Sequence, residues 1–177
     1  MPLPSVKRIP FDDEEGAKRL AADGWREIEV LETWETGKSF VRPALRSDLP
    51  AVVAIAGEVF TYDRLHADRE VANEDASAVK AEFARAAFDD RIRMIHVHGE
   101  PVDGFLISRL KGQHLIIDLV GVKKGHRGNG IAGQMIREAA KDADWIVAGT
   151  QSTNEPARHL YASLGMKIVK RERTYHR

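Results

Sequence analysis

Apolar and polar positions in the middle of the chain follow the patterns of β-strands. Residues 91–98 and 102–110 flank a turn at 99–101 and predict a hairpin. Residues 114–122 are apolar enough to predict a central strand that is covered on both faces. Four-residue spacing of Val79, Phe83 and Ala87 predicts a helix over about 77–88. The remaining predicted helices cover 14–23, about 50–60, 130–141 and 155–164, and the remaining strands cover 25–34, 39–44, 145–150 and 166–174.

This order of elements predicts an α/β fold, with a mixed central sheet and helices on both of its faces. A polar link with a turn glycine at Gly37 follows the strand over 25–34. We therefore predict two parts, a short N-terminal appendage of helix plus strand over 1–37 and a main domain over 38–177. The stretch 61–76 is polar and predicts an irregular connection.

Composition excludes several classes of function. The 27 Lys and Arg residues balance 27 Asp and Glu residues, so no general attraction to nucleic acid or to anionic membranes is expected. The chain has no cysteine, which excludes disulfides, thiolate metal sites and a cysteine nucleophile. It also lacks an apolar run of about 18 residues, so we expect a cytoplasmic protein. His96 and His98 share one face of a predicted strand, but no third ligand is evident and no metal is expected.

A glycine-rich basic loop follows the predicted central strand. Gly128, Gly130 and Gly133 match the spacing of a dinucleotide-binding turn, but five residues separate them from the strand end at Val122, whereas a Rossmann turn is tighter. The next strand also lacks a closing acidic residue for a ribose. Small residues at a helix start still let backbone N–H groups converge on an anion. Lys123, Lys124, His126 and Arg127 add positive charge there, so either a pyrophosphate site or a solvated basic turn is predicted.

Two segments of the chain resemble one enzyme family. Residues 127–132, Arg-Gly-Asn-Gly-Ile-Ala, resemble the R/Q-x-x-G-x-G/A loop of the GCN5-related N-acetyltransferases (GNATs). Residues 154–166 resemble the family's N-x-x-A-x-x-L-Y-x-x-x-G-F segment, with Met166 in the usual place of an aromatic residue. The resemblance covers about 39–177 and implies a GNAT fold with a splayed acetyl-CoA cleft, and acetyl-CoA as acetyl donor. The cofactor-binding residues that it implies are Val120, Val122, Arg127, Gly128, Asn129, Gly130, Ile131, Ala132 and Asn154.

Tyr161 lies on the apolar face of the helix predicted over 155–164. Its spacing from Leu160 and Leu164 is compatible with a core aromatic residue, or with a phenol aimed at the thioester sulfur. The resemblance favours Tyr161 as the general acid that protonates the departing thiolate. Asn154 suits a helix N-cap, and by resemblance also contacts the pantetheine arm, so two roles compete for one side chain.

Asp118 is a single carboxylate within the apolar central strand. Burial would suit it to take a proton from the attacking amine. The alternatives are an ion pair with Arg109 or Lys111, or deprotonation of the amine through water without a dedicated base.

Three segments are Phe-x-x-Asp-Arg-Leu-His-x-Asp over 60–68, Lys-x-Glu-Phe over 80–83 and Gly-Thr-Gln-Ser-Thr-Asn over 149–154. They resemble the dTDP-fucosamine acetyltransferase branch, which acetylates an amino group of a nucleotide-linked deoxysugar. By this resemblance Arg64, His66 and Asp68 line a substrate site for a small-molecule amine, whereas a plain polar surface loop is the alternative. A peptide or protein N-acetyltransferase and a non-catalytic acyl-CoA-binding module are the competing functions. Without cysteine no acetyl-cysteine forms, which favours direct transfer. The tail over 169–176 is long enough to pair across a homodimer.

Overall fold

We describe a computed structural model of the 177-residue chain, for residues 13–24 and 40–173. The chain divides into two units, 1–38 and 39–177. In the first unit, helix α1 (Glu14–Ala22) begins where Asp13 accepts a hydrogen bond from the Gly16 N–H at 2.8 Å. The helix predicted over 14–23 is thus confirmed. The strand predicted over 25–34 and the predicted link at 35–38 lie outside the described residues.

The second unit is built on a five-stranded sheet in the order β1-β2-β3-β4-β5. Its strands are β1 (Val41–Pro43), β2 (Arg93–His98), β3 (Gly104–Lys111), β4 (His114–Val122) and β5 (Trp145–Ala148). All neighbours pair antiparallel except β4 and β5, which are parallel. A parallel pair needs a crossover, and α5 (Ile131–Ala139) supplies it. The predicted mixed sheet is confirmed.

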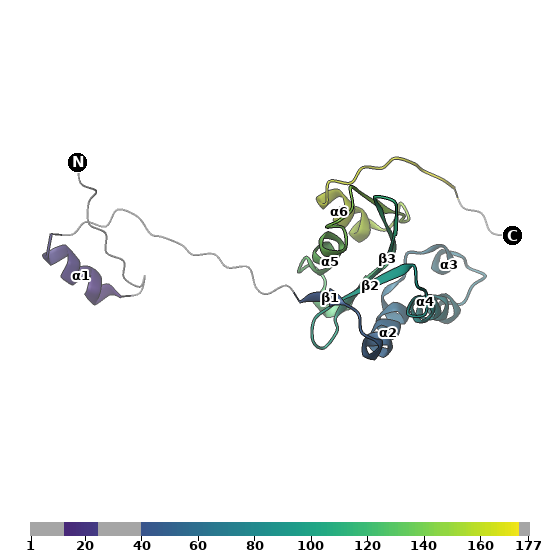
Figure 1. The fold of residues 1–177 in the computed structure, drawn as a ribbon, viewed down its shortest axis with the longest axis horizontal. Helices are drawn as coiled ribbons and strands as arrows, with labels where there is room; N and C mark the ends of the chain where they lie inside the picture. The colour runs from purple at the N-terminus through teal and green to yellow at the C-terminus, as the bar shows by residue number, and fades with distance from the viewer. Residues whose placement is uncertain (1–12, 25–39, 174–177) are drawn as a thin grey trace. The chain divides into compact units, whose positions relative to one another are not determined.

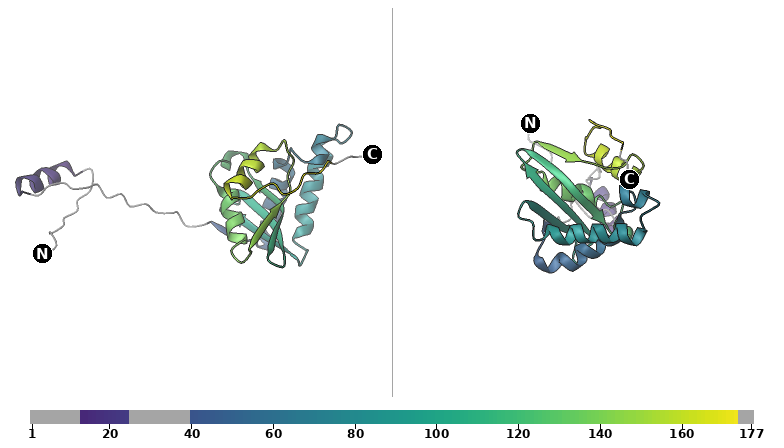
Figure 2. Two further views of the ribbon diagram at one scale, coloured as in Figure 1. Left: turned by 90° about the horizontal axis from the view of Figure 1, so that it is seen from above. Right: turned by 90° about the vertical axis from the view of Figure 1, so that its right-hand side faces the viewer.

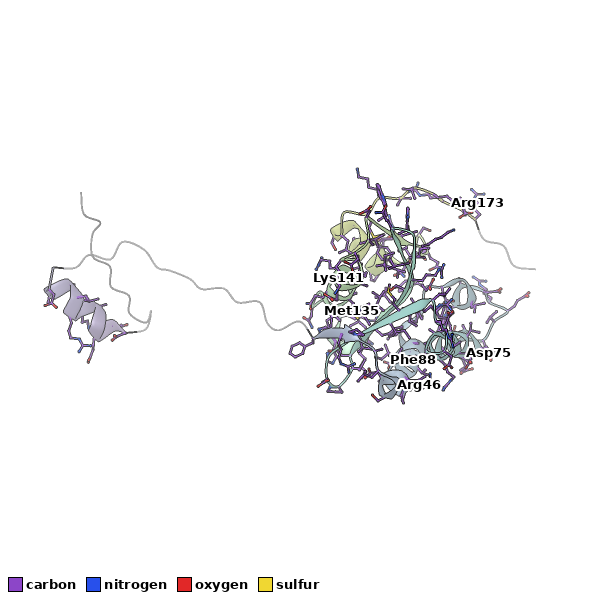
Figure 3. All side chains as sticks on the ribbon, viewed as in Figure 1. Arg46, Asp75, Phe88, Met135, Lys141 and Arg173 are labelled. Carbon is purple, nitrogen blue, oxygen red and sulfur yellow. The ribbon has the colours of Figure 1, made fainter. Side chains whose placement is uncertain are left out.

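Helices cover both faces of this sheet (Figure 2). The helices α2 (Leu49–Val59), α3 (Arg64–Ala67) and α4 (Asn73–Ala87) lie on one side, and α5 and α6 (Glu155–Ser163) on the other. Two apolar clusters result, and Phe88 packs on the first while Met135 belongs to the second (Figure 3). Short 3-10 turns, η1 (Arg46–Asp48) and η2 (Lys124–His126), precede α2 and follow β4.

A β-bulge interrupts the pairing of β3 with β4. Ile107 faces Leu119, but the next residue of β3, Ser108, faces Ile117, so Asp118 has no partner residue on β3. The extra residue turns the Asp118 side chain onto the α2/α4 face, where it meets Arg93 and Arg109. The sequence pattern had not indicated this bulge, because both neighbouring positions are apolar.

Two predictions from the sequence are wrong, one about an irregular connection and one about a strand. The polar stretch 61–76 contains the short helix α3, and α4 begins at Asn73 rather than near 77. No strand forms over the described part of the predicted strand 166–174, which is 166–173. Ile168 and Val169 are 62% and 95% exposed. Because they are adjacent in the sequence, they cannot share one face of a strand, and the charged residues around them give no apolar side to bury.

Candidate active site

β4 and β5 pair over only four residues each. Their last matched residues are Ile117 and Ala148, and β5 ends there. β4 continues to Val122, and among the described residues this part of β4 pairs with β3 alone, so backbone groups over 118–122 face an open edge. The resemblance places the splayed cleft at this edge.

Gly121 lies in this part of β4, and the structure gives a reason for a glycine here. A Cβ at this position would lie 2.8 Å from the Phe105 ring and 2.9 Å from Val59, both on the α2/α4 side of the sheet. Internal packing therefore accounts for the absence of a side chain here.

The basic glycine loop joins the open end of β4 to helix α5. Gly128 and Gly130 have φ angles of +85° and +73°, and an added Cβ at either position would meet nothing within 4 Å. Only the backbone conformation thus demands glycine there. Gly130 is the N-cap of α5 and no side chain caps this helix, so the first N–H groups, from Ile131 onwards, have no acceptor in the described part of the chain. Unpaired N–H groups at a helix start suit an anion.

Three predicted cofactor residues fix the shape of this loop. Arg127 donates from Nε to the Val122 carbonyl at 3.1 Å and from Nη2 to the Val59 carbonyl at 3.4 Å. Asn129 donates from Nδ2 to the His126 carbonyl at 3.3 Å. Ile131 is buried in the second apolar cluster. The side chains therefore hold the loop, while the N–H groups of Lys123, His126 and Arg127 bond backbone carbonyls and those at the start of α5 stay available for a ligand.

Asn154 and Tyr161 are placed by helix α6. Asn154 Oδ1 accepts from the Ala157 N–H at 3.3 Å, and its Nδ2 donates to Thr150 Oγ1 at 3.0 Å. The predicted cap is thus present, and the amide nitrogen is already engaged. Tyr161 is half-buried against the second cluster, together with Val120 and Val122 from the open end of β4. Burial raises the pKa of the Tyr161 phenol above its usual value, so the hydroxyl keeps its proton at neutral pH.

Asp118 is placed on the opposite face of the sheet. Its side chain is 9% exposed and bonds Arg93 Nε at 3.2 Å and Arg109 Nη1. Arg93 in turn bonds Asp90 and stacks on the Phe83 ring at 4.9 Å. The ion pair with Arg109, one of the sequence-based alternatives, is therefore present, and Arg93 joins it. Both carboxylate oxygens are occupied by guanidinium groups in this structure.

The predicted acceptor residues lie on or next to α3. Asp63 accepts from the Leu65 N–H at 2.9 Å and pairs with His66 Nδ1 at 2.7 Å, while His66 Nε2 lies 3.3 Å from Ser77 Oγ on α4. Burial alone would raise the pKa of Asp63, but its bonds to His66 and Leu65 and the nearby Lys80 lower it overall. The His66 side chain is only 6% exposed, so it joins α3 to α4 instead of projecting outward.

The other two acceptor candidates lie at the two ends of α3. Asp68 follows α3 and accepts a hydrogen bond from the Glu70 N–H at 3.0 Å. Arg64 is the first residue of α3, and its side chain lies outside the described part of the structure. The three candidates thus share one short segment, and their contact with an acceptor stays a prediction.

Comparison with known proteins decides the family. A model of the acetyltransferase (GNAT) family matches residues 49–166, about two thirds of the chain. The chain belongs to this family. It is 26% identical over 141 residues to the spore coat polysaccharide biosynthesis protein SpsD of Bacillus subtilis, covering 76% of this chain and 49% of that protein. The chain thus spans about half the length of this relative.

Solved structures agree with the GNAT fold. A mutant of the BH1408 protein of Bacillus halodurans matches with a TM-score of 0.61 and 17% identity, covering 77% of this chain and 98% of that chain. An aminoglycoside 6'-N-acetyltransferase of Acinetobacter haemolyticus matches with a TM-score of 0.57 and 12% identity, covering 77% and 97%. At these low sequence identities, the matches show only that the fold is shared.

GNAT acetyltransferases use acetyl-CoA, and the residues of this chain fit that group. The uncapped start of α5 suits the pyrophosphate, and the open edge of β4 suits the amides of the pantetheine arm. Ile131 of the loop, Val120 and Val122 of this edge, and Tyr161 all belong to or pack against the second apolar cluster, so these predicted cofactor residues lie on one side of the sheet. Among the described residues no group of three His, Cys, Asp or Glu side chains suits a metal ion. Nor does any described helix have the length and apolar character to cross a membrane.

One residue near the loop was not predicted from the sequence. Asp103, in the turn before β3, has a buried carboxylate that contacts His98 and His126. His126 is part of the glycine loop, whereas His98 ends β2, so the three residues come from separate segments. An acidic residue next to Gly104 gave no sequence signal of its own, because its partners depend on the fold.

Proposed function

We propose that this chain transfers an acetyl group from acetyl-CoA directly to a primary amine on a nucleotide-linked amino sugar. One observation supports acetyl transfer: the glycine loop with its uncapped helix start, the open edge of β4 and the neutral phenol of Tyr161 all adjoin the same apolar cluster. The sugar acceptor is supported by the likeness to SpsD, a polysaccharide biosynthesis protein. The sequence resemblance around 60–83 points the same way.

In this proposal each part of the site has one task. Acetyl-CoA supplies an activated thioester whose carbonyl carbon is attacked by the amine. The backbone N–H groups at the start of α5 hold the pyrophosphate, and the free edge of β4 orients the pantetheine arm. The Tyr161 hydroxyl donates its proton to the departing sulfur, so coenzyme A leaves as the thiol.

The ammonium proton of the attacking amine needs a different acceptor. Asp118 is our candidate base only if the acceptor displaces one of its guanidinium partners, since both of its oxygens are occupied. Otherwise the proton leaves through water, and Asp118 keeps Arg93 and Arg109 in place. Asp118→Asn separates the role of base from that of ion-pair partner. If Asp118 is the base, its loss lowers kcat most at low pH, because the amine is then fully protonated and needs a base to become nucleophilic.

The test is release of free thiol from acetyl-CoA by the purified chain, over a panel of nucleotide-linked amino sugars, N-terminal peptides and simple amines. We expect turnover with the amino sugars to exceed that with the other groups by at least about tenfold in kcat/KM. Preference for peptides would replace the sugar acceptor by a protein substrate. Binding of coenzyme A without thiol release on any amine would make the chain a non-catalytic binding module.

Two further expectations remain proposals. A cytoplasmic location accords with the absence of cysteine. Pairing of the tail across a homodimer is tested by light scattering of the full chain against a chain that ends at residue 166.

A further inference from the structure

Asp103 lies between the turn that joins β2 to β3 and the glycine loop that precedes α5. Its Oδ1 is 2.7 Å from His98 Nδ1, and its Oδ2 is 3.0 Å from His126 Nδ1. The carboxylate is 13% exposed, and the His98 imidazole is about equally buried. Both oxygens of one carboxylate therefore bridge two imidazoles from distant parts of the chain.

The backbone of Asp103 makes the same connection. Its N–H donates to the His98 carbonyl at 3.0 Å, and its carbonyl accepts from the Lys123 N–H at 2.8 Å. Gly99, with a φ of +82°, packs so closely that a Cβ there would lie 2.9 Å from the Asp103 carboxylate. The turn thus holds Asp103 rigidly, and Asp103 contacts the loop at both Lys123 and His126.

His126 also takes part in holding the glycine turn. Its carbonyl accepts the Asn129 side chain at 3.3 Å, and its imidazole is 52% exposed apart from the contact with Asp103. The glycines that follow, Gly128 and Gly130, have no side chains to fix their positions. The 3.0 Å polar contact with a buried carboxylate therefore limits how far this turn can move.

We propose that Asp103 is a positioning residue for acetyl-CoA: through His126 it holds the loop over 123–130 in the conformation that presents backbone N–H groups to the pyrophosphate. The inference rests on the proposed function. It concerns affinity for the pyrophosphate-containing part of the cofactor and leaves the acyl-transfer step to other residues. Asp103 itself does not touch the reacting atoms.

The test compares two donors that differ at the pyrophosphate. Coenzyme A binding is measured by calorimetry, and turnover is measured with acetyl-CoA and with S-acetylpantetheine, which lacks the pyrophosphate and nucleotide. For Asp103→Ala we expect the Kd for coenzyme A to rise about fivefold, since the polar contact between the half-exposed His126 and the buried carboxylate is lost. The kcat with saturating acetyl-CoA and the kcat/KM with S-acetylpantetheine stay unchanged. Asp103→Asn, which keeps the shape and one acceptor oxygen, restores part of the affinity.

Matched variants separate positioning from general damage. His98→Ala removes the partner that lies away from the loop, so coenzyme A affinity changes less than about threefold. His126→Ala weakens coenzyme A binding, and adding Asp103→Ala to it has little further effect because the two residues act through one contact. Circular dichroism of each variant checks that it folds. If Asp103→Ala does not fold, His126→Ala still tests the proposal, because this side chain is half-exposed and its loss should not unfold the chain.

The possible failures are distinguishable. If the wild-type chain does not bind coenzyme A, the proposed function fails. If it binds while Asp103 and His126 variants bind equally well, the positioning role is overturned and acetyl transfer is unaffected. Equal losses with S-acetylpantetheine, or additive losses in the double variant, also overturn the positioning role.

Discussion

Tyr161→Phe is the substitution that tests the proposed chemistry most directly, because it removes one oxygen atom and nothing else. The ring is half-buried on the second apolar cluster and would stay there. In the described part of the chain no hydrogen bond joins the hydroxyl to another residue, so the free energy of unfolding should change by less than about 1 kcal/mol. Coenzyme A affinity should also be unchanged, since the phenol faces the departing sulfur.

The effect on transfer should be large. A positioned general acid contributes about 10²–10⁴-fold, so kcat should fall by that factor, which corresponds to about 2.7–5.5 kcal/mol of activation free energy. The assay is thiol release at saturating acetyl-CoA and acceptor, with calorimetric binding of coenzyme A as the control. Equal kcat values for wild type and Tyr161→Phe would refute the general-acid role.

The pH profile gives a second, independent check on Tyr161. A general acid acts in its protonated form, and burial raises the pKa of this phenol above 10. Wild-type kcat should therefore hold up to about pH 10 and decline only above it. Tyr161→Phe should lack this alkaline decline. A decline that persists unchanged in the variant would assign it to another group.

Three predictions concern stability. Asn154→Ala removes the cap of α6 and should lower the free energy of unfolding by about 1 kcal/mol in urea, and an unchanged midpoint would contradict the capping bond. Gly121→Ala forces a methyl group to within 2.8 Å of the Phe105 ring and should cost about 1–3 kcal/mol, so a neutral result would show that the ring moves freely. The hydrogen bond from Arg42 lowers the pKa of Asp48, so this group contributes stability above its unfolded pKa of about 3.8 that is lost as pH falls below it. In Asp48→Asn the fall in stability between about pH 5 and pH 2 should be smaller than in wild type, and equal slopes would remove this assignment.

Local signals predicted the parts of the site that depend on a few neighbouring residues. The glycine loop was identified because glycines, a predicted helix start and basic side chains all lie within about ten residues. Asn154 was identified as a cap because an N-cap bonds the backbone three residues ahead. For such features the sequence separation between partners is short, so residue type and spacing are sufficient.

The same reasoning failed where the setting of a residue depends on contacts between segments that are distant in the sequence. The setting of Asp118 depends on a one-residue register shift between β3 and β4, and nothing in an apolar strand marks where a bulge falls. The contact of His66 with Ser77 on another helix could not be predicted either, because the two residues come together only in the fold. The short helix α3 has too few turns for a periodic pattern, although Asp63, which caps it, was a usable signal.

Asp118 and Asp103 show why residue type alone does not assign a role. Both are carboxylates with little exposure in strand-rich surroundings, and the sequence suggested only the one within the central strand as a candidate catalytic group. The structure surrounds that one with two arginines, whereas the other lies 3.0 Å from a histidine of the glycine loop. A buried carboxylate acts on whatever donors the fold places at its two oxygens, because leaving either oxygen unpaired is costly. The contribution of such a carboxylate to the reaction therefore depends on whether its donors belong to the strands of the sheet or to a loop that binds substrate.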